Sequence, residues 1–311
     1  MASFLSETFP PKPTFNPERD IPDLSGKVVI VTGGNTGIGK ETIQALLSKN
    51  AKVYMASRSK AKAEAAIAEL KSATGKDALF LPLDLANLDS ITKAATEFMS
   101  KEPALHLLFN NGGVMIPPID QLTSDGYDLQ FGTNVLGHAH FTLCLLPTLL
   151  AGAKSSSDGK ARVINTASNA ATFIDKIDFD TIRDGPKRQK MGKMNLYYQS
   201  KLGNVVFSNE LAKRYGSEGI ISHSLNPGSV KSDLSRHTPS LLLGLVGWMQ
   251  HPVEFGALTQ LWAGTSPEMI DTNGGYFIPW ARVGKMPTGA IDSEVGPKLW
   301  DWIEEQRKGH L

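Results

Sequence analysis

The chain has 311 residues, of which 41% are hydrophobic and 20% are charged, a composition typical of a packed globular protein. Lysine and arginine number 32 and aspartate and glutamate 31, which gives a formal net charge of +1. This balance provides no electrostatic footprint for nucleic acid or for an anionic membrane surface. The single cysteine, Cys144, cannot form an internal disulfide. We find no apolar run long enough to span a bilayer and no secretory signal, and therefore expect a soluble cytoplasmic protein.

Residues 1–22 contain five prolines, a density that breaks both helical and strand periodicity. We expect this Pro-rich segment to form an arm that lies on the surface or is disordered. The folded, catalytic domain is expected to span residues 23–311.

From residue 28 onward, short apolar runs alternate with stretches of helical periodicity. The predicted strands are 28–31, 53–56, 78–82, 105–109, 162–166 and 220–225. The predicted helices are 41–49, 60–72, 88–100, 122–149, 196–216, 252–264 and 294–308. Continuously apolar strands are buried on both faces, which predicts parallel strands joined by right-handed helical crossovers. We therefore expect one doubly wound α/β domain of the Rossmann type, with about seven strands and helices on both faces.

A glycine-rich loop, Thr32 to Gly39, directly follows the first predicted strand and precedes a predicted helix. Glycine has no Cβ atom, so Gly33, Gly37 and Gly39 would let the backbone approach a pyrophosphate closely. The free N–H groups and the dipole at the start of the helix would stabilise that pyrophosphate. The order of strand, loop and helix is the context that a dinucleotide-binding motif requires.

The spacing Thr-Gly-x-x-x-Gly-x-Gly resembles that of the short-chain dehydrogenase/reductase family, and further motifs of this family follow in the same order. They are Asp84-Leu85, Asn110-Asn111-Gly112-Gly113, Thr133-Asn134-Val135, Ser168, Tyr197 to Lys201, and Asn226-Pro227-Gly228-Ser229-Val230. The resemblance covers about residues 25 to 280 and implies a nicotinamide cofactor. The implied cofactor-binding residues are Gly33, Asn35, Thr36, Gly37, Ile38, Gly39, Arg58, Asp84, Leu85, Asn111, Gly112, Gly113, Tyr197, Lys201, Pro227, Gly228, Val230 and Ser232.

The end of the second predicted strand distinguishes NAD from NADP. Sites for NAD usually place a carboxylate there, which accepts hydrogen bonds from the ribose hydroxyls and repels a 2′-phosphate. This chain has Ser57-Arg58-Ser59 instead, and a guanidinium can pair with that phosphate. We therefore expect NADP(H), with Asn35 and Lys40 as further candidates near the phosphate. The alternative is that Arg58 is a solvated residue at a helix start.

Tyr197 and Lys201 are four residues apart and share one face of a predicted helix. A phenol has a reference pKa of about 10, so reversible proton transfer near neutral pH requires that its ionised form be stabilised. A lysine charge at about 4 Å contributes up to about 4 kcal/mol at an effective dielectric of about 20, which predicts a lowered tyrosine pKa. Tyr198 also shares a face with Lys201, but the family's Tyr-x-x-x-Lys spacing selects Tyr197.

The resemblance implies roles for three further groups. Ser168 would donate a hydrogen bond to the substrate carbonyl, Asn134 would hold a water that links Lys201 to solvent, and Lys201 would also bind the nicotinamide ribose. Two positions depart from the commonest pattern, because Gly112 stands where alanine is usual and Ser232 where threonine is usual. No histidine spacing predicts a metal site, and we interpret His138 as a packing or interface residue.

The segments 35–42 and 197–204 and the long insert between Ser168 and Tyr197 resemble the retinol dehydrogenase and WW-domain oxidoreductase-like branch, here as a soluble member. The basic run 187–190 in this insert is interpreted as a solvated loop face. Near 232–252 we expect a lid that shapes the substrate side. Its apolar stretch 241–249 is too short to span a bilayer and forms a lid, a core helix or a membrane-surface helix, of which the lid is favoured.

These observations favour an NADPH-dependent oxidoreductase that acts on a small-molecule carbonyl or alcohol, with a lipophilic aldehyde or ketone as substrate and Tyr197 as acid/base. Two alternatives remain: a ketoreductase of a phenolic or polyketide intermediate, and a noncatalytic NADP(H)-binding regulatory protein. The complete set of Asn134, Ser168, Tyr197 and Lys201 argues against the noncatalytic alternative. A homodimer is compatible with the sequence.

Overall fold

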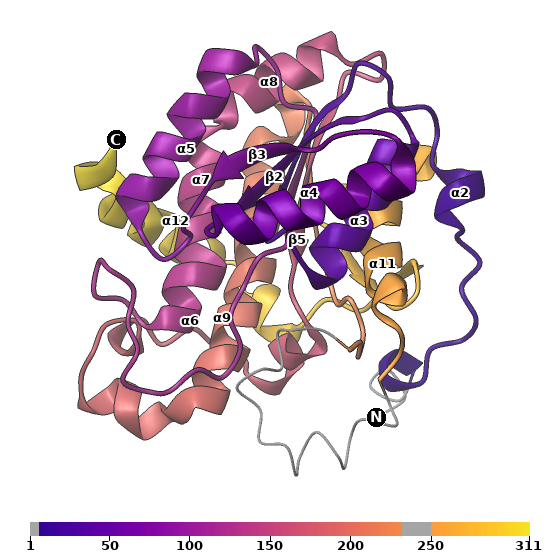
Figure 1. Cartoon of the computed structure of the whole chain (residues 1–311). Coiled ribbons are helices and arrows are strands. Elements are labelled where there is room, and N and C mark those ends of the chain that lie inside the picture. Colours follow the sequence, from indigo (N-terminus) through magenta and orange to yellow (C-terminus); the bar gives the residue numbers. More distant parts are fainter. Residues whose placement is uncertain (1–5, 232–249) are drawn as a thin grey trace.

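The computed structural model describes residues 6–231 and 250–311 (Figure 1), and its centre is one sheet of eight strands. The strand order is β3-β2-β1-β4-β5-β6-β7-β8. The strands are β1 (Val28–Thr32), β2 (Lys52–Ser57), β3 (Leu79–Pro82), β4 (Leu107–Asn110), β5 (Ala161–Thr166), β6 (Ile220–Leu225), β7 (Tyr276–Ile278) and β8 (Arg282–Val283). The first seven are parallel and β8 is antiparallel to β7. The predicted doubly wound fold is confirmed.

The chain direction across the sheet reverses between β1 and β4, because β2 and β3 lie on one side of β1 and the later strands on the other. In such sheets, ligands bind at the carboxyl ends of the strands next to this reversal. The two short strands β7 and β8 escaped prediction because they contain only three and two residues, although β7 is apolar throughout.

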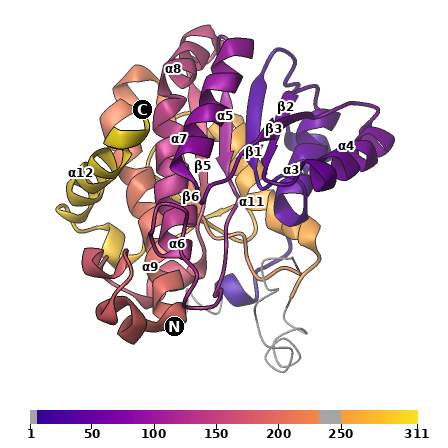
Figure 2. The same ribbon diagram turned by 60° about the vertical axis from the view of Figure 1, so that its left-hand side comes forward.

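Helices cover both faces of the sheet (Figures 1 and 2). The longer helices are α3 (Gly37–Ser48), α4 (Lys60–Thr74), α5 (Leu88–Lys101), α7 (His138–Cys144), α8 (Leu146–Ser155), α9 (Pro186–Tyr215), α11 (Val253–Thr265) and α12 (Val295–Arg307). Residues of α3, α4 and α11 pack in one core cluster. Residues of α5, α7, α9 and α12 pack in the other.

Strand β1 shows why the strands are apolar without alternation. Val29 and Val31 face the cluster that contains α3, whereas Val28 and Ile30 face the cluster that contains α9. Successive side chains of a strand point to opposite faces, so a strand between two helical layers needs an apolar residue at every position.

The amino-terminal segment packs more closely than its proline content suggests. Short helix α2 (Pro17–Asp20) is capped by the side chain of Asn16. Phe15 and Ile21 are buried and belong to the core cluster that contains α3. Glu7 is also buried, although it is charged. The segment is therefore anchored to the domain from residue 6 onward rather than lying loosely on its surface.

Two irregular helices position residues of the candidate site. The short helix α6 (Leu129–Phe131) continues into a π-helical turn, η1 (Gly132–Gly137), and then into α7. A second irregularity is Gly192, whose φ of 74° divides α9 into two helical parts, and Tyr197 and Lys201 lie on the second. Among the described residues, no single helix has the length and apolarity needed to span a membrane; only Leu129–Cys144 with Leu146–Ser155, bent by 59°, meets that test as a pair.

Candidate active site

A cavity of about 1240 Å³ opens where the central strands end. Its walls come from the turns that follow β1 through β6. Of the predicted site residues, those that line it are Gly33, Asn35, Thr36, Gly37, Ile38, Arg58, Asp84, Leu85, Asn111, Gly112, Gly113, Ser168, Tyr197, Lys201, Pro227, Gly228 and Val230. Gly39 and Asn134 lie behind this wall, and Ser232 and most of the expected lid lie outside the described residues.

The glycines of the first loop are required by close backbone contacts. A Cβ atom at Gly33 would lie 2.8 Å from the Cα of Gly112, and one at Gly39 would lie 2.5 Å from the carbonyl oxygen of Gly33. Gly33 and Gly37 also have positive φ angles of 64° and 57°. The loop after β1 therefore folds closely against the loop after β4.

Arg58 follows β2 directly, is exposed and lines the cavity together with Lys62 of α4. The hydroxyl of Ser57 is buried and has no hydrogen-bond partner among the described residues. No carboxylate follows β2 at this point. Lys40, the other predicted phosphate contact, instead pairs with Glu69 of α4 and does not line the cavity. The Lys40 expectation is therefore not met in this structure.

Tyr197, Lys201 and Ser168 line one cavity together. Tyr197 is 6% exposed and Lys201 is 4% exposed. The Lys201 ammonium lies 5.8 Å from the centre of the Tyr197 ring and donates a hydrogen bond of 3.0 Å to the carbonyl of Thr166. Ser168 follows β5, and its hydroxyl accepts from the backbone of Ala170 at 3.2 Å. The part of α9 that follows Gly192, which carries Tyr197 and Lys201, thus lies against the carboxyl end of β5.

Burial dominates the protonation of this group. It raises the pKa of Tyr197 to about 12, and a hydrogen bond with Ser168 acts in the opposite direction. Burial also lowers the pKa of Lys201 to about 8. The expected lowering of the Tyr197 pKa by Lys201 is therefore wrong for this geometry, since the Lys201 ammonium donates to Thr166 and burial dominates the Tyr197 pKa.

Asn134 lies in the π-helical turn η1 and is fully buried. Its side-chain amide exchanges hydrogen bonds with both backbone groups of Val114, at 2.9 and 3.0 Å. Its backbone carbonyl accepts from Asn204 at 2.7 Å and from His138 at 3.0 Å. These bonds fix the position of Asn134, and the expected role of holding a water stays a prediction.

His138 is a residue of this site that sequence reasoning did not assign. Because the Asn134 carbonyl can only accept, His138 Nδ1 carries the proton and Nε2 accepts from the hydroxyl of Thr32 at 2.9 Å. That hydroxyl in turn accepts the backbone N–H groups of Asn111 and Gly112, each at 2.9 Å. The neutral imidazole of His138 therefore connects Asn134, through Thr32, to the loop after β1 and to the loop after β4. Its position four residues after Asn134, on the same helical face, was the available signal.

Exposed apolar side chains form part of the cavity wall. Phe173 is 52% exposed and Met194 is 45% exposed, and both line the cavity. Phe173 also contacts Tyr198, with 5.2 Å between ring centres. Large exposed apolar groups at the mouth of a cavity are typical of a site for an apolar ligand.

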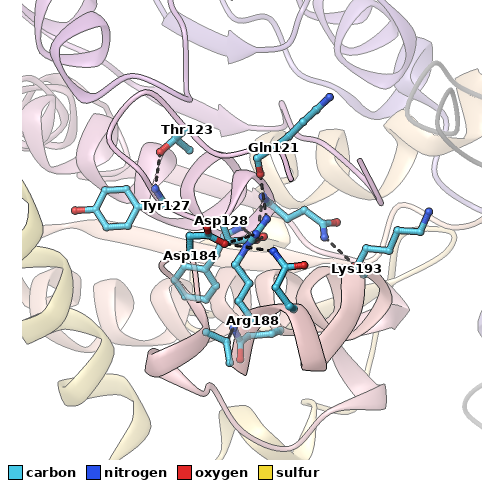
Figure 3. Close-up of polar contacts among 12 residues, drawn as sticks. Gln121, Thr123, Tyr127, Asp128, Asp184, Arg188 and Lys193 are labelled. Carbon is cyan, nitrogen blue, oxygen red and sulfur yellow. Dashed lines mark hydrogen bonds and ion pairs between the residues drawn. The ribbon is translucent and has the colours of Figure 1, made fainter. Parts of the chain in front are cut away.

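The insert that carries Met194 is held by a buried ion pair (Figure 3). Arg188 is 1% exposed, and its guanidinium contacts Asp128 at 3.0 Å, Asp184 at 3.1 Å and the carbonyl of Gln121 at 3.1 Å. Asp128 also caps α6 by accepting from the N–H groups of Gln130 and Phe131. The interpretation of 187–190 as a solvated loop face is therefore wrong at Arg188. A sequence pattern gave no sign of a buried partner 60 residues away.

Comparison with known proteins agrees with this geometry. A sequence profile described as short chain dehydrogenase matches residues 27–176. A short-chain dehydrogenase/reductase of Armillaria gallica is 56% identical over 308 residues, which are 99% of this chain and 98% of the relative. This chain belongs to the short-chain dehydrogenase/reductase family. It is accordingly an oxidoreductase.

Other members of the short-chain dehydrogenase/reductase family match most of the chain. A member from Neocamarosporium betae is 37% identical over 333 residues, with 100% of this chain and 94% of the relative covered. Among solved structures, an uncharacterized protein from Mycobacterium paratuberculosis aligns with a TM-score of 0.73 at 25% identity, covering 94% of this chain and 97% of that one. The Pseudomonas aeruginosa RhlG/NADP active-site complex aligns with a TM-score of 0.65 at 25% identity, covering 86% and 97%.

Proposed function

We propose that this protein is an NADP(H)-dependent oxidoreductase that interconverts a lipophilic aldehyde or ketone and the corresponding alcohol, with Tyr197 as the proton donor and acceptor. The observation that carries this proposal is the convergence of Tyr197, Lys201 and Ser168 in the cavity that the glycine loop also lines. A protein that only binds a dinucleotide has no chemical need for a phenol, a buried ammonium and a hydroxyl at one point.

The residues fit a dinucleotide. The close approach of Gly33 to Gly112 leaves a backbone surface that side chains would fill, and the N-terminus of α3 points at it. Pro227, Gly228 and Val230 would hold the nicotinamide end, and Asp84 and Leu85 the adenine end. Arg58 supports a preference for NADP(H), because its guanidinium stands at the end of β2, where NAD sites carry a carboxylate.

The chain's own groups would divide the remaining chemistry. The cofactor, when bound, supplies or accepts the hydride. Ser168 would donate a hydrogen bond to the substrate oxygen and stabilise the charge that develops there. Tyr197 would transfer the proton at its hydroxyl oxygen, and the Lys201 ammonium would favour the ionised phenol once its charge is directed toward Tyr197.

The substrate side supports an apolar compound. Phe173 and Met194 present large exposed apolar surfaces to the cavity, and Ile116, Pro117 and Leu129 continue the wall. Removing such surfaces from water on binding would favour a lipophilic carbonyl compound by about 25 cal/mol per Å² of apolar area.

The experiment that tests this function is a panel of aliphatic, aromatic and polycyclic aldehydes and ketones, phenolic and polyketide-like ketones included, with NADPH oxidation followed by absorbance. We expect turnover, with the more lipophilic members preferred. Tight NADPH binding without turnover of any member would contradict the proposal and support a noncatalytic regulatory protein. Preference for the phenolic ketones would support the ketoreductase alternative.

A further inference from the structure

The amino-terminal residues reach the same cavity as the catalytic groups. Glu7 and Thr8 line it together with Ser168, Tyr197 and the turn that follows β6. Residues 6–8 form a short piece of helix, which lies below α11 in Figure 1. The matching family profile begins at residue 27, so this segment lies outside the part of the chain that the profile describes.

Specific polar contacts fix the segment in place. The Arg282 guanidinium donates hydrogen bonds to the backbone carbonyl of Ser6 at 2.8 Å and to its hydroxyl at 2.9 Å. Glu7 is 5% exposed, and its carboxylate accepts a hydrogen bond of 2.9 Å from the side chain of Asn226. Burying a carboxylate is costly unless it is hydrogen-bonded, so these contacts specify where the Glu7 charge stands.

Glu7 is connected to two parts of the site, the turn after β6 and the segment after β5 that carries Ser168. On one side, the Asn226 side chain that binds it also accepts from the backbone N–H of Gly228 at 2.9 Å, in the turn after β6. On the other side lies Tyr276, whose hydroxyl donates to the backbone carbonyl of Ser168 at 3.2 Å. Burial raises the pKa of Tyr276, and the negative charge of Glu7 raises it further.

We propose that the segment Ser6–Thr8 is a wall of the substrate site and that Glu7 is a specificity-determining residue, which selects uncharged carbonyl substrates and rejects those that carry a carboxylate. This inference rests on the proposed oxidoreductase function and adds the class of substrate that the site accepts. Glu7 places a carboxylate at the edge of a cavity whose outer wall is apolar. A second carboxylate bound beside it would be repelled, whereas a neutral compound would not.

The test compares two ligands that differ in charge and by one methyl group, 4-carboxybenzaldehyde and its methyl ester, methyl 4-formylbenzoate; the change of preference in the Glu7 variants isolates the effect of the charge. Each is measured by NADPH oxidation and by calorimetric titration into the protein loaded with NADP⁺. We expect the wild-type protein to favour the ester over the carboxylate by about tenfold or more in kcat/KM and in affinity. In Glu7→Gln, this preference falls to about threefold or less, through improved use of the carboxylate. Glu7→Asp keeps the charge and retains the preference.

A matched control is Glu18→Gln, which removes an exposed carboxylate of α2 outside the cavity and leaves the preference unchanged. The inference is overturned if Glu7→Gln lowers the values for both ligands equally, which a purely structural role predicts, or if the preference does not move. It is also overturned if neither ligand binds the wild-type protein. Binding with the expected preference but without turnover would support Glu7 and contradict the proposed function, so the two failures are distinguishable.

Discussion

Arg58 connects one side chain to the choice of cofactor. It follows β2, is exposed and lines the cavity, and the adjacent buried hydroxyl of Ser57 has no partner among the described residues. A cation at this position would attract a 2′-phosphate, whereas a carboxylate would attract the ribose hydroxyls of NAD. Cofactor preference should therefore depend on this position more than on the rest of the cofactor site.

We predict that Arg58→Asp raises the KM for NADPH by about tenfold or more and changes the KM for NADH by less than about threefold, because the new charge repels the phosphate that only NADPH carries. Steady-state kinetics with both cofactors measure this effect. Lys60→Asp is the matched control, since Lys60 is exposed and lies outside the cavity. An equal rise for both cofactors would contradict the role given to Arg58.

The residues that sequence could reveal are those that form a motif with their near neighbours. Gly33, Tyr197 and Lys201 are recognisable because their partners are only a few positions away. Glu7 was not, because the residue it binds, Asn226, lies 219 positions away. No local pattern records such a contact, and only the fold brings these groups together.

At the scale of elements, the first part of α9 is fixed to the loop before α6 by the ion pair of Arg188 and Asp128. Burial raises the pKa of Asp128, while Arg188 and two backbone N–H groups lower it. These contacts hold the insert that supplies Met194 to the cavity. The basic run 187–190 therefore contains one structural residue among solvated ones.

We predict that Arg188→Met destabilises the protein by about 3 to 5 kcal/mol, because it leaves the Asp128 carboxylate buried without its cation. Urea denaturation measures the change in the free energy of unfolding. Lys187→Met is the control, because Lys187 pairs with Asp180 at the surface, and a surface pair contributes about 1 kcal/mol or less. A similar loss of unfolding free energy in the two variants would show that the buried Arg188–Asp128 pair stabilises the protein no more than a surface pair does.

At the scale of the whole molecule, four buried histidines whose pKa values are lowered by burial, His106, His138, His140 and His223, make stability depend on pH. Burial lowers the pKa values of His138, His140 and His223 to about 4. A group whose folded pKa is lower than its unfolded value of about 6.5 contributes stability that is complete above pH 6.5 and is lost as the pH falls toward 4. The protein should therefore be stable near neutral pH and lose stability in mild acid.

We predict that His138→Gln reduces the loss of unfolding free energy between pH 7 and pH 4.5 by about 2 kcal/mol, because glutamine keeps a polar side chain but does not titrate. Urea denaturation at the two pH values provides the measurement, with His310→Gln, which alters a residue near the surface, as the control. An unchanged pH dependence in His138→Gln would mean that His138 does not remain neutral in the folded protein.

The whole fold was more predictable than the site because its signal is distributed along the chain. Strands such as β1 lie between two helical layers and need apolar residues throughout, which the sequence displays directly. The anchoring of Phe15 and Ile21 was not predicted, since prolines obscure periodicity without preventing single residues from packing into the core. The direction of the Tyr197 pKa shift could not be predicted from the sequence either, because burial, which only the fold determines, is its largest cause.

The central claim is that Tyr197 transfers the proton in an NADPH-dependent carbonyl reduction. The most direct measurement is the rate of NADPH oxidation by Tyr197→Phe with the best carbonyl substrate of the wild-type protein, beside NADPH affinity measured by fluorescence titration. We predict that kcat falls by about 10²-fold or more while the NADPH dissociation constant changes by less than about threefold, because phenylalanine fills the same space without a proton to give. Turnover within about threefold of the wild-type rate would contradict the account.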